Sequence, residues 1–394
     1  MNKNSNPVAL LAFAFRPFFL LTGLYGLVIV AAWMSYLFGG LPLPLGWSSL
    51  HWHSHEMLFG LTSPAIAGFI LTAMCNWTGA PPLQGKGLLA LVLAWLAGRV
   101  VMWTASWLPV GLVAVVDMLF LPALAIYVAR VLLRHGNKRN LILVAILALL
   151  SVANLLMHIG FVTGKTLCLT FGELLAFNLI TMMMVVIGGR IIPAFTGNWL
   201  RNNRGLTNVV KPCPQLDRLT LITTALLIPA DFLISIPAVT GVIALLAALL
   251  NALRLWHWRG WLGAKEPLLW ILHVGYLWIV LALLFKGLAA FTLVPPSAWQ
   301  HALGVGGMAT LILGIMTRVA LGHTGRPMTL PNFAVIIYVA ITLAALGRVL
   351  TALAIVNYSA GLMLSASGWI LAFGLFTVIY WPILSRPRAD GRPG

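Results

Sequence analysis

Long apolar runs alternate with short polar connections along nearly the whole chain. A helix needs about 20 apolar residues to cross the hydrocarbon core of a bilayer. Twelve runs reach that length, and their expected boundaries are roughly 17–39, 52–75, 87–107, 109–133, 140–162, 169–192, 216–235, 237–258, 266–291, 297–320, 331–355 and 359–384. The pattern predicts an all-α, polytopic membrane protein with about twelve transmembrane helices, in which residues 1–394 form a single transmembrane domain.

Basic residues are confined to alternate connections between these runs. One set of connections holds Lys86, Arg130, Arg134, Lys138, Arg139, Arg190, Arg201, Arg204, Lys211, Arg218, Arg254, Arg259, Lys265, Arg318 and Arg326, and both termini match it. The other set holds only Lys165, with Lys286 near a span end. Because lysine and arginine are enriched in cytoplasmic loops, both termini are predicted to be cytoplasmic and the number of spans even. Residues 385–394 are predicted to form a disordered tail.

Composition supports lipid as the solvent of this chain. Of its 394 residues, 61% are hydrophobic and 8% are charged, whereas soluble domains carry roughly 25% charged residues. The net charge of +17 does not indicate nucleic-acid binding, because the basic residues lie where the membrane topology places them. The chain is therefore expected to have the lipid bilayer as a partner and no nucleic acid.

Trp52-His53-Ser54-His55-Glu56 places two imidazoles and a carboxylate at the start of the second run. Ionisable groups at the edge of hydrocarbon are costly unless they are paired or ligated. Imidazole is the commonest metal ligand, and such a pair suits haem or copper. His53 and His55 point about 200° apart on a regular helix, so they face one metal only where the first turn is irregular. The alternative is that these side chains sit in the headgroup belt.

Three further histidines are candidate ligands. His301 opens the tenth span and His323 follows its end, and their 22-residue separation is about 33 Å along a helix, too far for one iron. We therefore expect His301 to join His53 or His55 in an outer site, and His323 to join His273 of the ninth span in an inner site. For His273 and His323, hydrogen bonding to a neighbouring helix or its end is the alternative.

Other polar groups within the apolar runs have separate expected roles. Glu56 and Glu173 are candidate proton-transfer groups, and Glu56 is also placed to orient an imidazole. Arg348 suits a haem propionate, which a guanidinium binds in bidentate fashion. Arg99 and Asp117 lie at matching depths in the third and fourth spans and are predicted to form a structural ion pair. The catalytic residues themselves are left unassigned.

A Thr-Gly pair follows the second, sixth and tenth spans, at Thr78-Gly79, Thr196-Gly197 and Thr324-Gly325. Each interval between the pairs holds four predicted spans, as three copies of a four-helix unit would give. Such an arrangement resembles the catalytic subunit of haem–copper oxidases and nitric-oxide reductases in architecture only. The alternative is that Thr-Gly is an ordinary helix ending, where glycine is the favoured residue.

Several longer motifs point to a family. They are Phe15-Arg16-Pro17-Phe18-Phe19-Leu20, the block Trp52 to Gly60, Ala67-Gly68-Phe69-Ile70-Leu71-Thr72-Ala73, Asn76-Trp77-Thr78-Gly79, Gly189-Arg190-Ile191-Ile192-Pro193-Ala194-Phe195-Thr196, and the block Met316 to Pro327. In this order they resemble the NnrS family, and the resemblance covers nearly the whole chain.

The resemblance implies a multi-pass protein of the bacterial inner (plasma) membrane that binds haem and copper. It implies a role in the response to nitric oxide and in protection from nitrosative stress, often beside denitrification genes. The histidines within the family motifs here are His53, His55, His301 and His323. Two hypotheses follow: a haem and copper protein that binds or turns over nitric oxide or a related small molecule, with an unknown electron donor, or a multi-span transporter of a metal, haem or small anion.

Overall fold

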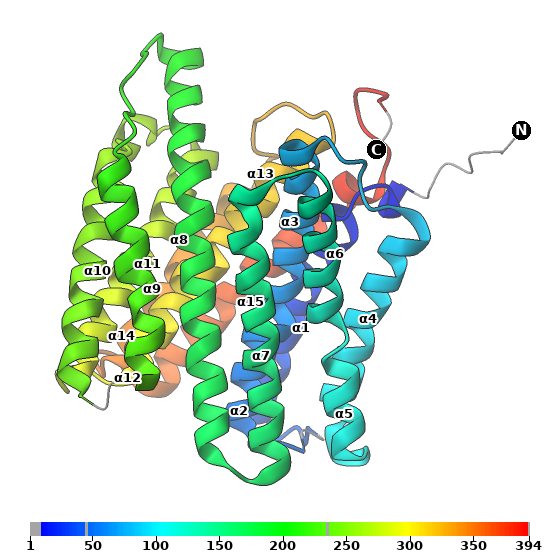
Figure 1. Ribbon diagram of the computed structural model, residues 1–394, viewed down its shortest axis with the longest axis vertical. Helices are drawn as coiled ribbons and strands as arrows, with labels where there is room; N and C mark the ends of the chain where they lie inside the picture. The colour runs from blue at the N-terminus through cyan, green and yellow to red at the C-terminus, as the bar shows by residue number, and fades with distance from the viewer. Residues whose placement is uncertain (1–8, 44–45, 234–235, 393–394) are drawn as a thin grey trace, which may run out of the picture. The chain divides into compact units, whose positions relative to one another are not determined.

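The computed structural model describes residues 9–43, 46–233 and 236–392. These described residues form helices joined by turns and short loops, without a strand (Figure 1). Within them, eleven helices are long and apolar enough to cross a membrane. The prediction of an all-α, multi-pass membrane protein is therefore confirmed.

The seventh predicted span is the one that the count of eleven leaves out. It corresponds to α9 (Pro214–Leu233), a helix of 20 residues. This helix carries Asp217, Arg218 and Asp231 among its 20 residues, a higher proportion of charged residues than in any of the other eleven. It is a helix of spanning length, as expected, and both of its carboxylates are paired within the protein, as described below.

The internal contacts divide the chain into two compact units, which are described separately. The first unit comprises Met1–Ala176, Met316–Met328 and Phe373–Gly394. Its elements are η1 (Ala9–Leu11), α1 (Phe15–Gly39), α2 (Ser49–His55), η2 (Glu56–Leu61), α3 (Thr62–Thr78), α4 (Gly85–Trp103), η3 (Ala105–Trp107), α5 (Val110–Asp117), α6 (Phe120–Arg134), η4 (Lys138–Asn140) and α7 (Leu141–Thr163). It also contains the first turns of α8 (Thr166–Arg204) and the last turns of α13 (Thr310–His323) and α15 (Tyr358–Ser385).

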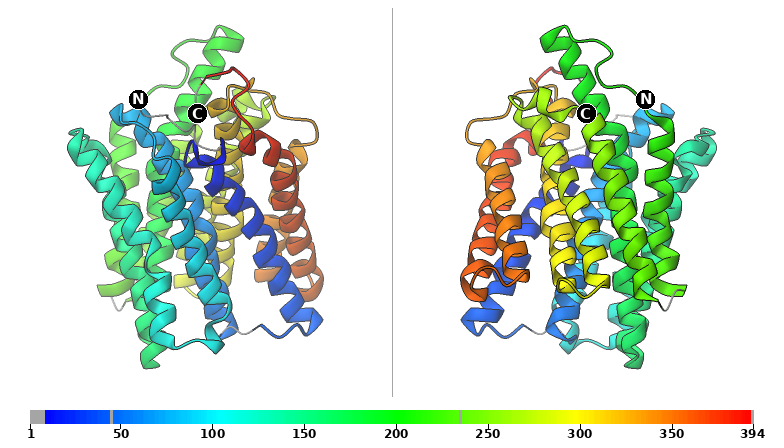
Figure 2. Two further views of the ribbon diagram at one scale, coloured as in Figure 1. Left: turned by 90° about the vertical axis from the view of Figure 1, so that its right-hand side faces the viewer. Right: turned by 90° about the vertical axis from the view of Figure 1, so that its left-hand side faces the viewer.

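The second unit comprises Phe177–Ile315 and Thr329–Ala372. It holds the rest of α8, α13 and α15, together with α9, α10 (Pro237–His257), η5 (Gly260–Gly263), α11 (Pro267–Ala290), α12 (Pro296–His301), η6 (Ala302–Ala309) and α14 (Val335–Ala352). Helix α10 packs against both α9 and α11, as the right-hand view in Figure 2 shows. Whether the two units make one domain, as the sequence predicts, stays a prediction.

Two spans are interrupted by π-helices directly after a histidine. The π-helix η2 begins at Glu56, after His55, and the π-helix η6 begins at Ala302, after His301. Each histidine lies 23 residues before the threonine of a Thr-Gly pair, as a repeat of these two spans would give. A π-helix holds about one extra residue per turn and is frequently found at functional sites. The irregular turn begins after His55, whereas His53 and His55 both lie in the regular helix α2, so it does not bring the two imidazoles to one face.

The sixth span departs from its expected end. Helix α8 continues through Thr196 and Gly197 to Arg204, so this Thr-Gly pair does not close the span. The helix has 39 residues, about 58 Å at 1.5 Å per residue, which exceeds the roughly 30 Å of hydrocarbon. Its last turns therefore extend beyond the bilayer, and half of the connection expected at 193–215 is helical. The hydroxyl of Thr196 bonds to the carbonyl of Ile192, four residues back, so it does not interrupt the helix.

Candidate functional site

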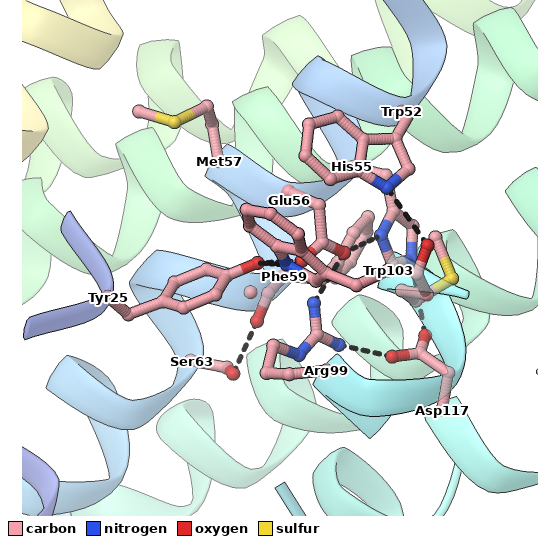
Figure 3. Close-up of polar contacts among 12 residues, drawn as sticks. Tyr25, Trp52, His55, Glu56, Met57, Phe59, Ser63, Arg99, Trp103 and Asp117 are labelled. Carbon is pink, nitrogen blue, oxygen red and sulfur yellow. Dashed lines mark hydrogen bonds and ion pairs between the residues drawn. The ribbon is translucent and has the colours of Figure 1, made fainter. Parts of the chain in front are cut away.

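His55 and Glu56 lie side by side at the junction of α2 and η2, and both side chains are fully buried. His55 Nδ1 is 2.9 Å from Glu56 Oε1. Neighbouring residues on a regular helix point about 100° apart, and these two side chains meet where α2 passes into the π-helix η2. The expected orientation of an imidazole by Glu56 is thus present for His55 (Figure 3).

Arg99 of α4 joins both buried carboxylates. Its Nη1 donates to Glu56 Oε1 at 2.5 Å, and its Nη2 donates to Asp117 Oδ1. The two acids are fully buried and the guanidinium nearly so. The predicted Arg99–Asp117 ion pair is confirmed, and Glu56 extends it into a group of three charges. Figure 3 shows the guanidinium between the two carboxylates.

Aromatic donors enclose the Glu56 side of this group. Tyr25 of α1 donates its hydroxyl hydrogen to Glu56 Oε2, and Trp103 Nε1 donates to the Tyr25 oxygen at 2.9 Å. Trp52 is fully buried, and its Nε1 donates to the carbonyl of Met102 at 3.0 Å. Because each of these polar atoms is hydrogen bonded, the surrounding apolar rings exclude lipid from the charges at little cost.

Helix α7 supplies two more polar side chains, Asn154 and His158, one turn apart. Asn154 Nδ2 donates to Asp117 Oδ2 at 2.9 Å, and His158 Nε2 lies 2.9 Å from the same oxygen. His55 Nε2 lies 3.2 Å from it. His55, Asp117 and His158 each direct one potential ligand atom to a common point, within 4.8 Å of one another.

Both ring nitrogens of His55 face oxygen atoms of this cluster. Its Nδ1 faces the Glu56 carboxylate, while its Nε2 faces Asp117 Oδ2 and, at 2.8 Å, Asn154 Oδ1. The amide orientation is fixed because Asn154 Nδ2 donates to Asp117. A neutral imidazole has only one N–H, so one ring nitrogen would direct a lone pair at oxygen lone pairs. A second proton on the ring, or a cation bound at one of the two ring nitrogens, removes this conflict.

The charge count agrees with this requirement. The buried cluster holds the carboxylates of Glu56 and Asp117 and only the guanidinium of Arg99 among its described members, which leaves one negative charge in excess. An uncompensated buried charge is strongly unfavourable. A protonated imidazole or one bound monovalent cation neutralises the cluster.

Glycine at position 60 makes room for these charges. A Cβ there would lie 2.7 Å from Arg99 Nη1 and 2.9 Å from Glu56 Oε2. Gly60→Ala is therefore expected to push the two groups apart and to lower the free energy of unfolding by about 1–3 kcal/mol. Thermal unfolding in a mild detergent measures this. Gly304→Ala is the control, because Gly304 also lies in a π-helix and its Cβ would meet open space; equal losses in both variants would contradict the explanation.

Each of the outer candidate residues has its own contacts within its unit. His53 stacks on Trp33 of α1, with ring centroids 4.5 Å apart, while His55 turns into the buried cluster. Glu173 lies near His51, with 3.9 Å between Glu173 Oε2 and His51 Nδ1. His301, in the second unit, places Nδ1 2.7 Å from the carbonyl of Ser297. Their shared role as ligands stays a prediction.

The inner candidates are also found in separate surroundings. His273 Nε2 lies 2.9 Å from the hydroxyl of Thr196 in the second unit, so it makes the interhelical hydrogen bond that was its alternative role. His323 packs its ring against Phe15 in the first unit, with centroids 5.7 Å apart. Arg348 lies near the end of α14, a helix that packs against α12. No ligand role of these three residues is tested by this geometry.

Comparison with known families gives a match over nearly the whole chain. A family model described as NnrS protein matches residues 9–388, nearly the whole chain. The chain belongs to the NnrS family. A comparison with curated proteins found no match. The family assignment that the motifs indicate is therefore confirmed, and the NnrS chain is a multi-pass membrane protein with a buried His–Asp–His group that could hold a metal.

The sequence of this NnrS protein makes His158 a weaker ligand candidate than the other histidines and assigns no site role to Asn154. Asp117 was expected only as the partner of Arg99. The available signal was the spacing of Asn154 and His158, which puts two polar side chains on one face of a helix otherwise rich in apolar residues. The sequence does not reveal Asp117 as their common partner, because nothing in it places α7 beside α5.

Proposed function

We propose that this protein is a haem- and copper-binding protein of the bacterial inner membrane that acts in the response to nitric oxide and protects against nitrosative stress. Membership of the NnrS family supports the cofactors, the cellular role and the link to denitrification. The observation that carries the metal assignment is His55, whose ring nitrogens both face hydrogen-bond acceptors in a cluster with one excess negative charge.

The buried cluster fits copper by its donor set. His55 Nε2, His158 Nε2 and Asp117 Oδ2 converge, and Asn154 Oδ1 adds a fourth oxygen. Imidazole and carboxylate ligands suit copper, zinc and iron. Glu56 holds the other nitrogen of His55, as carboxylates commonly do behind a metal-bound imidazole. A bound copper ion would supply one-electron redox chemistry, while the protein keeps the site away from water.

The tautomer of His301 that carries its proton on Nδ1 suits a haem ligand. Its Nδ1 donates to the carbonyl of Ser297, which is the hydrogen bond that orients a ligating imidazole in metal proteins. Arg348 makes no ion pair with a carboxylate in the described part of the chain, and it lies on a helix that packs against the one carrying His301. We assign it to a propionate. Nitric oxide is small and apolar, so it reaches such a site through lipid without a polar channel.

Removing an imidazole from the cluster tests the copper assignment. His55→Ala and His158→Ala are each expected to weaken copper binding at least about 10–100-fold, as losses around a metal centre do. Metal analysis of purified protein after equilibration with a copper chelator measures it. His135→Ala is the matched control, because this exposed histidine bonds only to the carbonyl of Val131. Wild-type copper content in both cluster variants would reject the site.

The visible spectrum tests the haem and nitric oxide parts separately. Purified protein is expected to show a Soret band that shifts on addition of nitric oxide, and His301→Ala should remove or alter that band. An unchanged band in His301→Ala would reject the ligand while leaving the cofactor in place. Loss of copper without loss of the Soret band in His55→Ala would show that the two centres are separate.

The transporter hypothesis has one observation in its favour. The π-helices η2 and η6 interrupt two spans at corresponding positions, and interrupted helices line the binding sites of many transporters. A colourless purified protein whose reconstituted vesicles accumulate copper or haem would favour transport. A spectrum that survives purification, with no uptake, favours the redox protein.

A further inference from the structure

Three segments meet at one end of the first unit: the start of α1, the end of α13 and the residues after α15. Arg16 is fully buried, and its Nη1 donates to the carbonyls of Leu384 at 2.8 Å and Arg386 at 2.7 Å. Arg388 Nη1 donates to the carbonyl of His323 at 2.9 Å. The C-terminal segment is thus held against the start of the first span (Figure 1).

A backbone contact completes this attachment. The amide of Ala389 donates to the carbonyl of Thr324 at 2.9 Å, and a Cβ on Gly325 would collide with the Asp390 carboxylate. The segment after Ser385, which the sequence predicts to be disordered, therefore docks on the Thr324-Gly325 helix end as far as it is described. Because it docks there, it brings its own charges to a fixed place.

The result is a group of mostly basic side chains, which we call the tail cluster: Arg16, Arg326, Arg386, Arg388 and Asp390. Arg16 is close enough to Arg326 and Arg388 to be repelled by both. Asp390 pairs with Arg388, whose guanidinium holds the pKa of this carboxyl at about 2. Four guanidinium groups against one carboxylate leave an excess of three positive charges in the described tail cluster.

The tail cluster lies where spans leave the hydrocarbon. Helix α1 begins at Phe15, α13 ends at His323 and α15 ends at Ser385, and each is part of a candidate membrane-spanning helix. Side chains one to three residues beyond these ends reach the level of lipid headgroups. Arg386 is exposed there, and Arg326 and Arg388 are partly exposed. Neither Arg326 nor Arg386 makes an ion pair with a carboxylate in the described residues.

We propose that the tail cluster binds the headgroup of an anionic phospholipid. Guanidinium groups bind phosphate in bidentate fashion, and basic pockets at the ends of spans take up anionic headgroups. A zwitterionic lipid brings its own ammonium group into an already positive site and is disfavoured. The excess charge is produced by tertiary structure, since its members come from three distant segments, so it differs from a basic loop that only sets topology.

The test is native mass spectrometry of the full-length protein, titrated with phosphatidylglycerol or phosphatidylcholine. Wild type is expected to retain phosphatidylglycerol in preference to phosphatidylcholine. Each surface arginine contributes about five-fold to anionic-lipid binding, so Arg326→Gln with Arg386→Gln should weaken retention about 30-fold. The control, Arg134→Gln with Arg139→Gln, removes two exposed arginines of the same unit outside the tail cluster and should leave retention unchanged.

Asp390→Asn gives a result in the opposite direction, because it removes the only carboxylate of the tail cluster and should strengthen phosphatidylglycerol binding about five-fold. This variant also decides the matter where the double variant fails to fold. Equal retention in wild type, the double variant and Asp390→Asn would overturn the proposal. Inorganic phosphate that displaces the lipid completely at millimolar concentration would show a free-anion site instead. None of these readouts depends on haem or copper.

Discussion

Arg99→Met is expected to lower the free energy of unfolding by about 3–5 kcal/mol, because it leaves two buried carboxylates without their common cation. Arg99 joins Glu56 and Asp117, whose side chains are fully buried. Without the guanidinium, both acids either ionise in an apolar surrounding or take up protons and lose their hydrogen bonds to the histidines. Unfolding in a detergent and urea series measures the loss.

Two comparison variants make the Arg99 result specific. Arg134→Met makes the same change on an exposed arginine of the same unit and should alter stability by less than about 0.5 kcal/mol. Arg99→Lys keeps the charge but cannot reach both carboxylates with a planar fork, so its loss should fall between the two. A loss for Arg99→Met no larger than that of Arg134→Met would mean that the ion-paired group is not formed.

Lys286→Met is expected to have a similarly large effect in the second unit. Lys286 Nζ donates to Asp231 Oδ2 at 2.5 Å and to Asn178 Oδ1 at 2.8 Å, and both charged side chains are buried. The ammonium also lies 4.9 Å from the centre of the Trp299 ring. Removing it leaves the Asp231 carboxylate unpaired within a span, at a cost of about 3–5 kcal/mol.

The double variant Asp231→Asn with Lys286→Met tests whether the two residues stabilise the protein as a pair or independently of each other. Replacing both partners removes the uncompensated charge, so the double variant should be more stable than Lys286→Met alone. The same denaturation series measures the free energy of unfolding of wild type, Asp231→Asn, Lys286→Met and the double variant. Additive losses from the two substitutions would show that the residues do not interact, and would remove the explanation given for the charges on α9.

The sequence predicts much of the fold because lipid imposes simple rules. Spans need length and apolar composition, and the expected runs match the helices of the structure. The exception in composition, α9, is explained by Asp231 and Asp217, which pair with Lys286 and Arg254. Orientation follows from the loop charges and stays a prediction, because a structure without a membrane does not test it.

The sequence predicts contacts in the candidate site only where the depth of a residue within its span determines its partner. Arg99 and Asp117 meet because their positions along adjacent spans match, and an intramembrane charge needs a partner. The meeting of Asp117 with His55 and His158 depends on which helices lie side by side, and apolar faces carry little information on that. The π-helix after His55 was also beyond prediction, since its residues resemble those of any apolar helix.

The π-helix η2 has an evolutionary consequence. A π-helix differs from an α-helix by one inserted residue, and each residue turns the helix by about 100°. The wide turn takes up this extra residue, so one residue can be lost between Glu56 and Leu61 while α2 and α3 keep their orientation. Related chains whose span is shorter by one residue in this turn therefore remain compatible with the same helix packing.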